Sequence, residues 1–270
     1  MTRPVQPFES ALRRARRYGV DAPSVPIGLL VAALACFVGA SSRSSRTRAR
    51  LSRPLKAVGA SLLLQAACYL HTTWRGKFLF WEQQLDCLEL SGDEHILDIG
   101  CGRGAVLLMA ARRLSTGRAV GVDLWRTRDQ SGNSEAATWR NAVAEGVTER
   151  IQLQTGDMTE LALPDESFEI VVSSLAIHNI PTTAGRVKAI DEAVRVLRPN
   201  GRLVIADIRA SDLYRARLLA SGMASVSTVG LGWRGWWGSP WVPTVRVTAT
   251  KPADTPRAAL SGAVSAVRGS

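Results

Sequence analysis

Two hydrophobic patterns divide the chain near residue 75. Before that point lie two long uncharged runs, residues 22–42 and 57–74, separated by a basic stretch. After it, short apolar runs alternate with stretches whose apolar residues recur at helical spacing. The patterns predict two apolar N-terminal helices followed by a globular α/β domain over residues 75–251.

Within that domain, the alternation predicts a doubly wound, mostly parallel sheet of seven strands. The first five strands are expected at HILDIG (95–100), RAVGVDLW (118–125), RIQLQTGD (150–157), FEIVVSSL (168–175) and RLVIADI (202–208), and the intervening helices at 104–115, 134–146 and 184–197. A strand, a long loop and a last strand are expected over residues 222–252. Crossover connections of this kind place ligands at the carboxyl ends of the strands.

The length of the first uncharged run favours a membrane. It has 21 residues without charge, and a helix needs about 20 apolar residues to cross a bilayer core. The second run has 18 and includes Gln65 and His71. Residues 22–74 are therefore predicted to be a membrane hairpin or anchor. A cleaved signal peptide, an organelle transit peptide or buried helices of a soluble cap are the alternatives.

Charge distribution complicates the membrane topology. The formal net charge is +11, and residues 1–80 carry the whole excess, with 13 basic and two acidic residues. Their basic positions cluster in the N-terminal segment 1–21 and in the linker 43–56. If both runs cross the membrane and the catalytic domain is cytoplasmic, the basic linker lies outside, against the positive-inside tendency. If only one run crosses, the basic N-terminal segment lies outside instead. A hairpin dipping into one leaflet keeps both on the cytoplasmic side.

The charge of the globular domain and the spacing of the cysteines argue against some partners. Because residues 1–80 carry the whole excess charge, residues 81–270 have no net charge. A nucleic-acid enzyme is expected to carry a basic surface on its catalytic body, so nucleic acid is not predicted as a partner. The cysteine spacing matches neither a zinc site nor a disulfide framework, and no metal is predicted. The four cysteines are interpreted as reduced structural thiols: Cys36, Cys68, Cys87 and Cys101.

The glycine-rich segment ILDIGCGRG, residues 96–104, predicts a close backbone approach to a ligand. A P-loop needs Lys and then Ser or Thr after its last glycine, whereas Ala105 and Val106 follow here. A dinucleotide loop has the spacing G-x-G-x-x-G, whereas this loop is G-x-G-x-G. Asp98 stands two residues before the first glycine, where a carboxylate disfavours a pyrophosphate and favours a ligand that carries an ammonium group.

Two further acids follow strand ends. Asp123 ends the second predicted strand, where a carboxylate can accept both hydroxyls of a ribose. Asp157 ends the third and is suited to accept from an adenine amino group. Together with Asp98, these carboxylates match a ligand with an ammonium group, a ribose and an amino-purine.

The motifs LDIGCGRG, VGVDLW, TGDMTELALPDESFEIVVSSLAIHNI and RVLRPNGRLVIADI resemble the successive motifs of class I S-adenosylmethionine-dependent methyltransferases. The nearest type is shared by quinone-biosynthesis and many small-molecule methyltransferases, and the resemblance covers about residues 85–251. TTWRGKF (72–78) and DQSGNS (129–134) also resemble a little-characterised, membrane-attached group of bacterial type. One departure is Asn200, where the family usually has glycine; asparagine tolerates the left-handed turn conformation.

This resemblance implies S-adenosylmethionine as the cofactor and assigns its contacts. The glycine loop would wrap the methionine part, Asp123 and Leu124 would bind ribose and adenine, Asp157 and Met158 would hold the adenine edge, and Ser174 would lie where cofactor and acceptor meet. The implied cofactor-binding set is Asp98, Gly100, Cys101, Gly102, Gly104, Asp123, Leu124, Asp157, Met158 and Ser174.

A base is needed only for some acceptors, because positioning supplies much of the rate of methyl transfer. His178 is the one histidine placed near the expected site, and it either acts as a base or lines the pocket. The long loop expected within residues 222–252 contains four tryptophans: Trp233, Trp236, Trp237 and Trp241. Three interpretations remain open: they cover an apolar acceptor, they lie at the headgroup level of a membrane, or they pack on the surface of the domain.

The prediction is thus a membrane-attached methyltransferase, with its catalytic domain on the cytoplasmic side, acting on a small, apolar or lipid-like acceptor. An NAD-type oxidoreductase and a non-catalytic membrane scaffold are the alternatives. Residues 252–270 are predicted to be a disordered tail. The sequence does not predict an oligomeric state.

Overall fold

The computed structural model describes residues 11–41 and 46–253 of the protein. The basic segment 1–21 is therefore described only from residue 11, and the linker 43–56 only from residue 46. The tail predicted to be disordered lies outside the described residues beyond Ala253.

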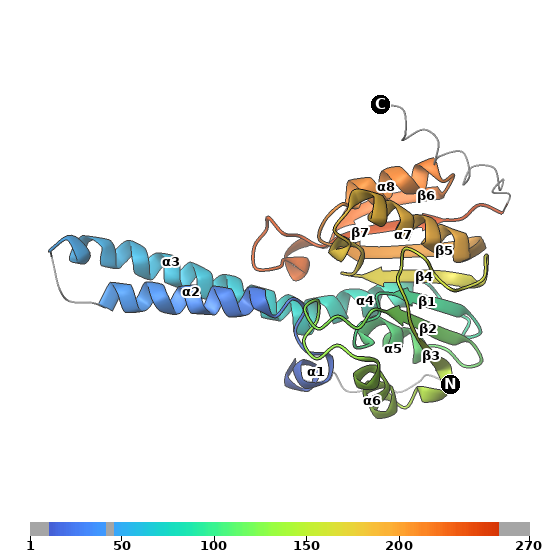
Figure 1. Ribbon diagram of the computed structural model, residues 1–270, viewed down its shortest axis with the longest axis horizontal. Helices are drawn as coiled ribbons and strands as arrows, with labels where there is room; N and C mark the ends of the chain where they lie inside the picture. Colours follow the sequence, from blue (N-terminus) through green and yellow to red (C-terminus); the bar gives the residue numbers. More distant parts are fainter. Residues whose placement is uncertain (1–10, 42–45, 254–270) are drawn as a thin grey trace.

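Seven strands form one twisted sheet in the order β3-β2-β1-β4-β5-β7-β6 (Figure 1). Their bounds are β1 His95–Ile99, β2 Arg118–Asp123, β3 Ile151–Thr155, β4 Phe168–Ser174, β5 Leu197–Asp207, β6 Ala224–Gly230 and β7 Val245–Thr250. The first five strands pair in parallel, and β7 runs antiparallel to both β5 and β6. The predicted doubly wound, mostly parallel sheet is confirmed.

Both faces of the central strands are buried, which explains their continuous apolar runs. Ile96 and Val172 point into a core that includes residues of α4 and α5, whereas Leu97 and Val171 point into a core with α7 and α8. The helices of the domain are α4 Lys77–Cys87, α5 Ala105–Ala111, α6 Glu135–Glu145, α7 Thr183–Val196 and α8 Ser211–Ala220, with short helices η2 Thr148–Arg150, η3 Ile177–Asn179 and η4 Gly232–Gly235.

The strand order reverses between β1 and β4, so the crevice at this switch point opens at their carboxyl ends. The fifth strand, expected from residue 202, begins earlier: residues 198–201 form an irregular start of β5, because Phe168 of β4 already pairs with Leu197. Asn200 has φ 63°, the left-handed conformation expected for it.

The N-terminal part consists of α1 Ala11–Tyr18, α2 Ser24–Ser41, α3 Arg46–His71 and a π-helical turn, η1 Thr72–Gly76, that continues into α4. Helices α2 and α3 form an antiparallel hairpin that projects away from the sheet (Figure 1). Gly59 permits their close approach, since a Cβ atom there would lie 3.0 Å from the Phe37 ring and 3.3 Å from the Ala33 carbonyl oxygen.

Two apolar membrane helices were expected, and this is wrong in number. Among the described helices, only α2 is long and apolar enough to cross a membrane, and only 11% of that stretch is buried. The basic residues from Arg46 onward are part of α3 rather than a separate linker. From the end of α3 into η1, Tyr69 and Thr72 are buried and contact Trp237 and Trp236, so this end of the second apolar run is a wall of the globular part.

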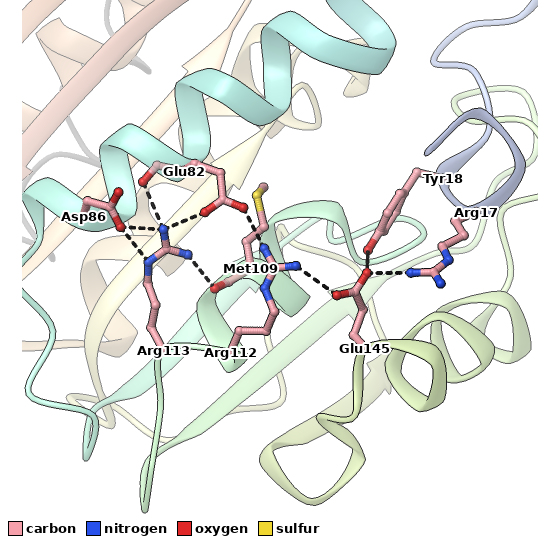
Figure 2. A network of polar contacts seen from close by, with 8 residues as sticks. All are labelled: Arg17, Tyr18, Glu82, Asp86, Met109, Arg112, Arg113 and Glu145. Carbon is pink, nitrogen blue, oxygen red and sulfur yellow. Dashed lines mark hydrogen bonds and ion pairs between the residues drawn. The ribbon is translucent and has the colours of Figure 1, made fainter. Parts of the chain in front are cut away.

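A network of polar contacts fastens α1 to the domain (Figure 2). Glu145 of α6 accepts from Arg17 at 2.9 Å and from the Tyr18 hydroxyl at 3.3 Å. Its second oxygen accepts from Arg112 at 2.9 Å, and Arg112 also pairs with Glu82 of α4 at 2.6 Å. This network fixes the start of the segment that leads from α1 to the hairpin.

Candidate active site

A cavity of about 200 Å³ lies at the carboxyl ends of β1, β2 and β4. It brings together nine of the ten residues predicted to bind the cofactor, together with His178. The nine are Asp98, Gly100, Cys101, Gly102, Asp123, Leu124, Asp157, Met158 and Ser174.

Backbone geometry makes glycine necessary in the loop after β1. Gly100 and Gly102 have φ of 76° and 53°, and a Cβ atom would overlap Ala176 at the first position and the Gln130 side chain at the second. Gly104 does not line the cavity. It precedes α5 in the left-handed conformation, with φ 83°, packed against Thr138, so it shapes the loop from behind.

Asp98 is the most unusual group at this site. Its side chain is 1% exposed, and neither carboxylate oxygen has a hydrogen-bond partner among the described residues. Burial raises the pKa of Asp98 to about 7; the nearby Leu107 backbone partly offsets this rise, and the Asp123 charge adds a smaller one. A buried carboxylate without partners is costly, so this position is suited to a cationic group from a ligand.

Asp123 has a second task besides any ligand contact. Its Oδ2 accepts from the Gly102 N–H at 2.9 Å, and its Oδ1 accepts from the Trp125 N–H at 2.5 Å and the Asn133 amide at 3.1 Å. The carboxylate thereby ties the glycine loop to the end of β2.

The remaining predicted contacts lie around the mouth of the cavity. Asp157 is exposed, and its Oδ1 accepts from the backbone N–H and hydroxyl of Thr159, both at 2.8 Å. Leu124 is 38% exposed, which leaves an apolar surface for a flat ring. Ser174, at the end of β4, accepts from the Trp81 indole N–H at 2.9 Å.

His178 forms a pair with an acid that the sequence analysis did not select. Its Nδ1 lies 2.5 Å from Oδ1 of Asp207, at the end of β5. Asp207 is 1% exposed and also accepts from the backbone N–H groups of His178 and Ile208 and from the Tyr214 hydroxyl. A proton on Nδ1, donated to this carboxylate, leaves the lone pair on Nε2. Asp207 could have been found by extending the strand-end search to the fifth strand.

The N-terminal segment also reaches the cavity, which the sequence analysis missed. Asp21 and Ala22 line it, and Asp21 forms an isolated bridge with Gln130 of the DQSGNS segment. The Asp21 carboxylate accepts from Lys77 at 2.6 Å and from the Gln130 amide at 3.2 Å. The Tyr69 hydroxyl donates to the Asp21 carbonyl at 2.8 Å. The segment preceding α2 thus forms one wall of the cavity.

The four loop tryptophans have different surroundings. Trp237 is buried, lines the cavity and packs edge-on against Tyr69 with ring centroids 5.0 Å apart. Trp233 and Trp241 are 57% and 88% exposed. Gly238 of the same loop approaches the hairpin at Gln65. The loop therefore lies beside the base of the hairpin.

The chain is similar to known methyltransferases. The family described as "Methyltransferase domain" matches residues 97–205. The 27-O-demethylrifamycin SV methyltransferase of Amycolatopsis mediterranei is 30% identical over 150 residues, covering 52% of this chain and 50% of that protein. The ubiquinone/menaquinone biosynthesis C-methyltransferase of Roseobacter denitrificans is 27% identical over 154 residues, covering 54% and 56%. The chain spans about half the length of the curated relatives it matches.

The fold is also shared with solved structures. Geranyl diphosphate methyltransferase in complex with GPP and sinefungin superposes with a TM-score of 0.52 at 15% identity, over 67% of this chain and 80% of that one. The hairpin precedes the part matched by the family. Residues 97–205 of the chain therefore match a methyltransferase domain, and the solved structure shares its fold.

Proposed function

We propose that this protein is a membrane-attached methyltransferase that transfers the methyl group of S-adenosylmethionine to a small, apolar or lipid-like acceptor. The observation that carries the methyltransferase assignment is Asp98, a buried carboxylate with no hydrogen-bond partner among the described residues, which lines the cavity at the carboxyl ends of the strands. S-adenosylmethionine has the ammonium group that such a carboxylate requires, and it supplies a methyl group on a sulfonium.

The other residues of the cavity have complementary roles in the proposal. Asp98 binds the ammonium group, the glycine loop surrounds the methionine part, and Asp123 accepts the ribose hydroxyls while holding the loop. Leu124, Asp157 and Met158 hold the adenine. Because four hydrogen bonds fix the Asp207 carboxylate, His178 is oriented with Nε2 available to accept a proton from an acceptor hydroxyl or acidic carbon.

A labelling experiment tests the activity. Full-length protein is incubated with methyl-labelled S-adenosylmethionine and an extract of its own cells, and the products are split between organic and aqueous phases. We expect label in the organic phase with wild type and much less label with Asp98→Asn at the same cofactor concentration. Label only in the aqueous phase contradicts an apolar acceptor, and no enzyme-dependent label in either phase contradicts the transferase assignment.

Membrane attachment rests on the exposed surface of the hairpin. Most of the exposed large apolar side chains are on α2, α3 and the tryptophan loop beside them, including Val31, Leu34 and Val38 at 61–63% and Leu64 at 72%. Such a contiguous apolar surface is costly in water and typical of a membrane-interaction site. The 18 residues of α2 span about 27 Å, close to the roughly 30 Å of a bilayer core.

The hairpin geometry argues against insertion tip-first into one leaflet. Helix α3 begins at Arg46, at the end of the hairpin farthest from the sheet, and Arg53 is exposed near that end (Figure 1). Each arginine at the centre of a bilayer costs about 2.5–3.5 kcal/mol or more. In our proposal the basic end therefore lies in a headgroup layer, with the catalytic domain on the cytoplasmic side, where the cofactor is available.

Substitutions on the hairpin test the attachment. The double variant Val31→Asp/Leu34→Asp is compared with Val143→Asp/Leu219→Asp, a matched pair of exposed apolar positions on α6 and α8. Wild type and the second variant should pellet with washed membranes, whereas the first should shift to the supernatant. A hairpin variant that still pellets like wild type places the attachment elsewhere.

A further inference from the structure

A second cavity, of about 210 Å³, adjoins the one described above. The two share Lys77, Ser174, Leu175 and Trp237. Ser174 and Leu175 lie at the carboxyl end of β4, whereas Lys77 begins α4 and Trp237 lies in the loop after η4. A molecule in the second cavity could therefore present one atom to the first while its body lies outside it.

Apolar and aromatic side chains form much of the second cavity. Leu79, Phe80 and Trp81 come from α4, and Val229 and Leu231 from the end of β6 and the loop after it. Phe80 and Trp81 pack edge-on against each other, with ring centroids 5.2 Å apart. These walls suit a flat or branched apolar body.

The charge of the lining is one-sided. Lys77, Arg234 and Arg246 line the cavity, and no Asp or Glu is among the described residues that do so. Lys77 is paired with Asp21. The two arginines have no carboxylate partner within the described part of the chain, which leaves two guanidinium groups beside an apolar cavity.

Arg246 is the better placed of the two. It projects from β7, its Nη1 donates to the neutral Gln84 side chain at 2.9 Å, and its Nε is buried without a hydrogen-bond partner among the described residues. Arg234 is exposed and lies over the Trp233 ring, 5.7 Å from its centroid. A guanidinium with unused donors at a cavity wall binds an oxyanion in a fork geometry.

We propose that the second cavity binds an amphipathic anion, with an apolar or aromatic body against Trp81 and Phe80 and a carboxylate or phosphate on Arg246 and Arg234. This deepens the function proposed above and rests on it for one point, that the bound anion is the methyl acceptor. The apolar acceptor of that proposal then carries one acidic group.

Calorimetry with the full-length protein in neutral detergent tests the site, using naphthalene-2-carboxylate and its uncharged amide as probes. The acid should bind at least about tenfold more tightly than the amide, the scale of a charge-assisted hydrogen bond. Arg246→Gln should remove that difference and leave amide binding unchanged. Arg215→Gln, an exposed position on α8 with the same change in charge, should bind both probes like wild type.

Titration of S-adenosylhomocysteine into the same samples separates the two proposals. A protein that binds this cofactor product but neither probe, or that binds acid and amide equally, overturns the anion site and leaves the methyltransferase proposal intact. Loss of cofactor binding in Arg246→Gln would indicate that this variant is misfolded. In that case the exposed position Arg234 tests the site, and Arg234→Gln should bind the acid more weakly than wild type does. Unchanged acid affinity in the folded arginine variants also overturns the site.

Discussion

Lowering the pH should weaken cofactor binding through Asp98. Its pKa of about 7 in the ligand-free protein means that a proton and the ligand ammonium group compete for the carboxylate. The ionised fraction falls from about 0.76 at pH 7.5 to about 0.09 at pH 6. Since only the ionised form attracts the ammonium group, the dissociation constant should rise about eightfold over this interval.

Isothermal titration calorimetry with S-adenosylhomocysteine measures this effect, because the product keeps the ammonium group. The ligand stays charged throughout the interval, because the α-amino group of a free amino acid has a higher pKa than the N-terminus of a peptide. Repeating the titration at pH 6 in buffers with different ionisation enthalpies should reveal the release of about 0.9 proton per ligand bound.

Two variants assign the titration to a residue. Asp98→Asn should lose about 10–100-fold in affinity, the scale of a hydrogen bond to a charged group, and its affinity should not vary between pH 6 and 7.5. His178→Asn is the control, because it changes another side chain of the same cavity and leaves Asp98 in place, and it should keep the wild-type slope. A pH-independent dissociation constant in wild type, or an unchanged slope in Asp98→Asn, would refute the reasoning.

Three further changes probe the rest of the site. Asp207→Asn should lower kcat about 10–100-fold without changing S-adenosylhomocysteine affinity, because His178 loses its orienting anion; an unchanged kcat in the labelling assay would contradict a role for this pair. Asp21→Asn should weaken S-adenosylhomocysteine binding several-fold by loosening the N-terminal wall, and wild-type affinity would show that this wall does not contribute. Gly102→Ala should lower the melting temperature more than Gly146→Ala. Both glycines have positive φ, but only at Gly102 would a Cβ atom overlap another side chain, that of Gln130. Equal shifts would contradict this steric argument.

Ligand-free stability gives an independent check on Asp98. A carboxyl group whose folded pKa is raised from 3.8 to about 7 favours folding in its protonated form, so stability is lost as pH rises between these values. From pH 5.5 to 7.5 the loss is about 2 kcal/mol. Urea unfolding should show this loss in wild type and not in Asp98→Asn, and parallel pH profiles would contradict it.

Local sequence determined the doubly wound domain and most of the candidate site. Each strand that is buried on both faces reads as an apolar run, and the polar residues at or just beyond its carboxyl end must lie at the same edge of the sheet. Asp98, Asp123 and Asp157 were therefore predictable without knowing which strands are neighbours. The glycines were predictable because a tight approach after a strand excludes side chains.

Only the tertiary structure decided what joins the N-terminal part to this cavity. Asp21 meets Lys77 and Gln130 across 56 and 109 residues, and no periodicity along the chain encodes such a contact. Which side chains of the hairpin stay exposed was likewise a tertiary property, since the end of α3 is buried against the domain whereas α2 is largely exposed. Composition measures how apolar a run is, whereas packing determines whether solvent, lipid or protein covers it.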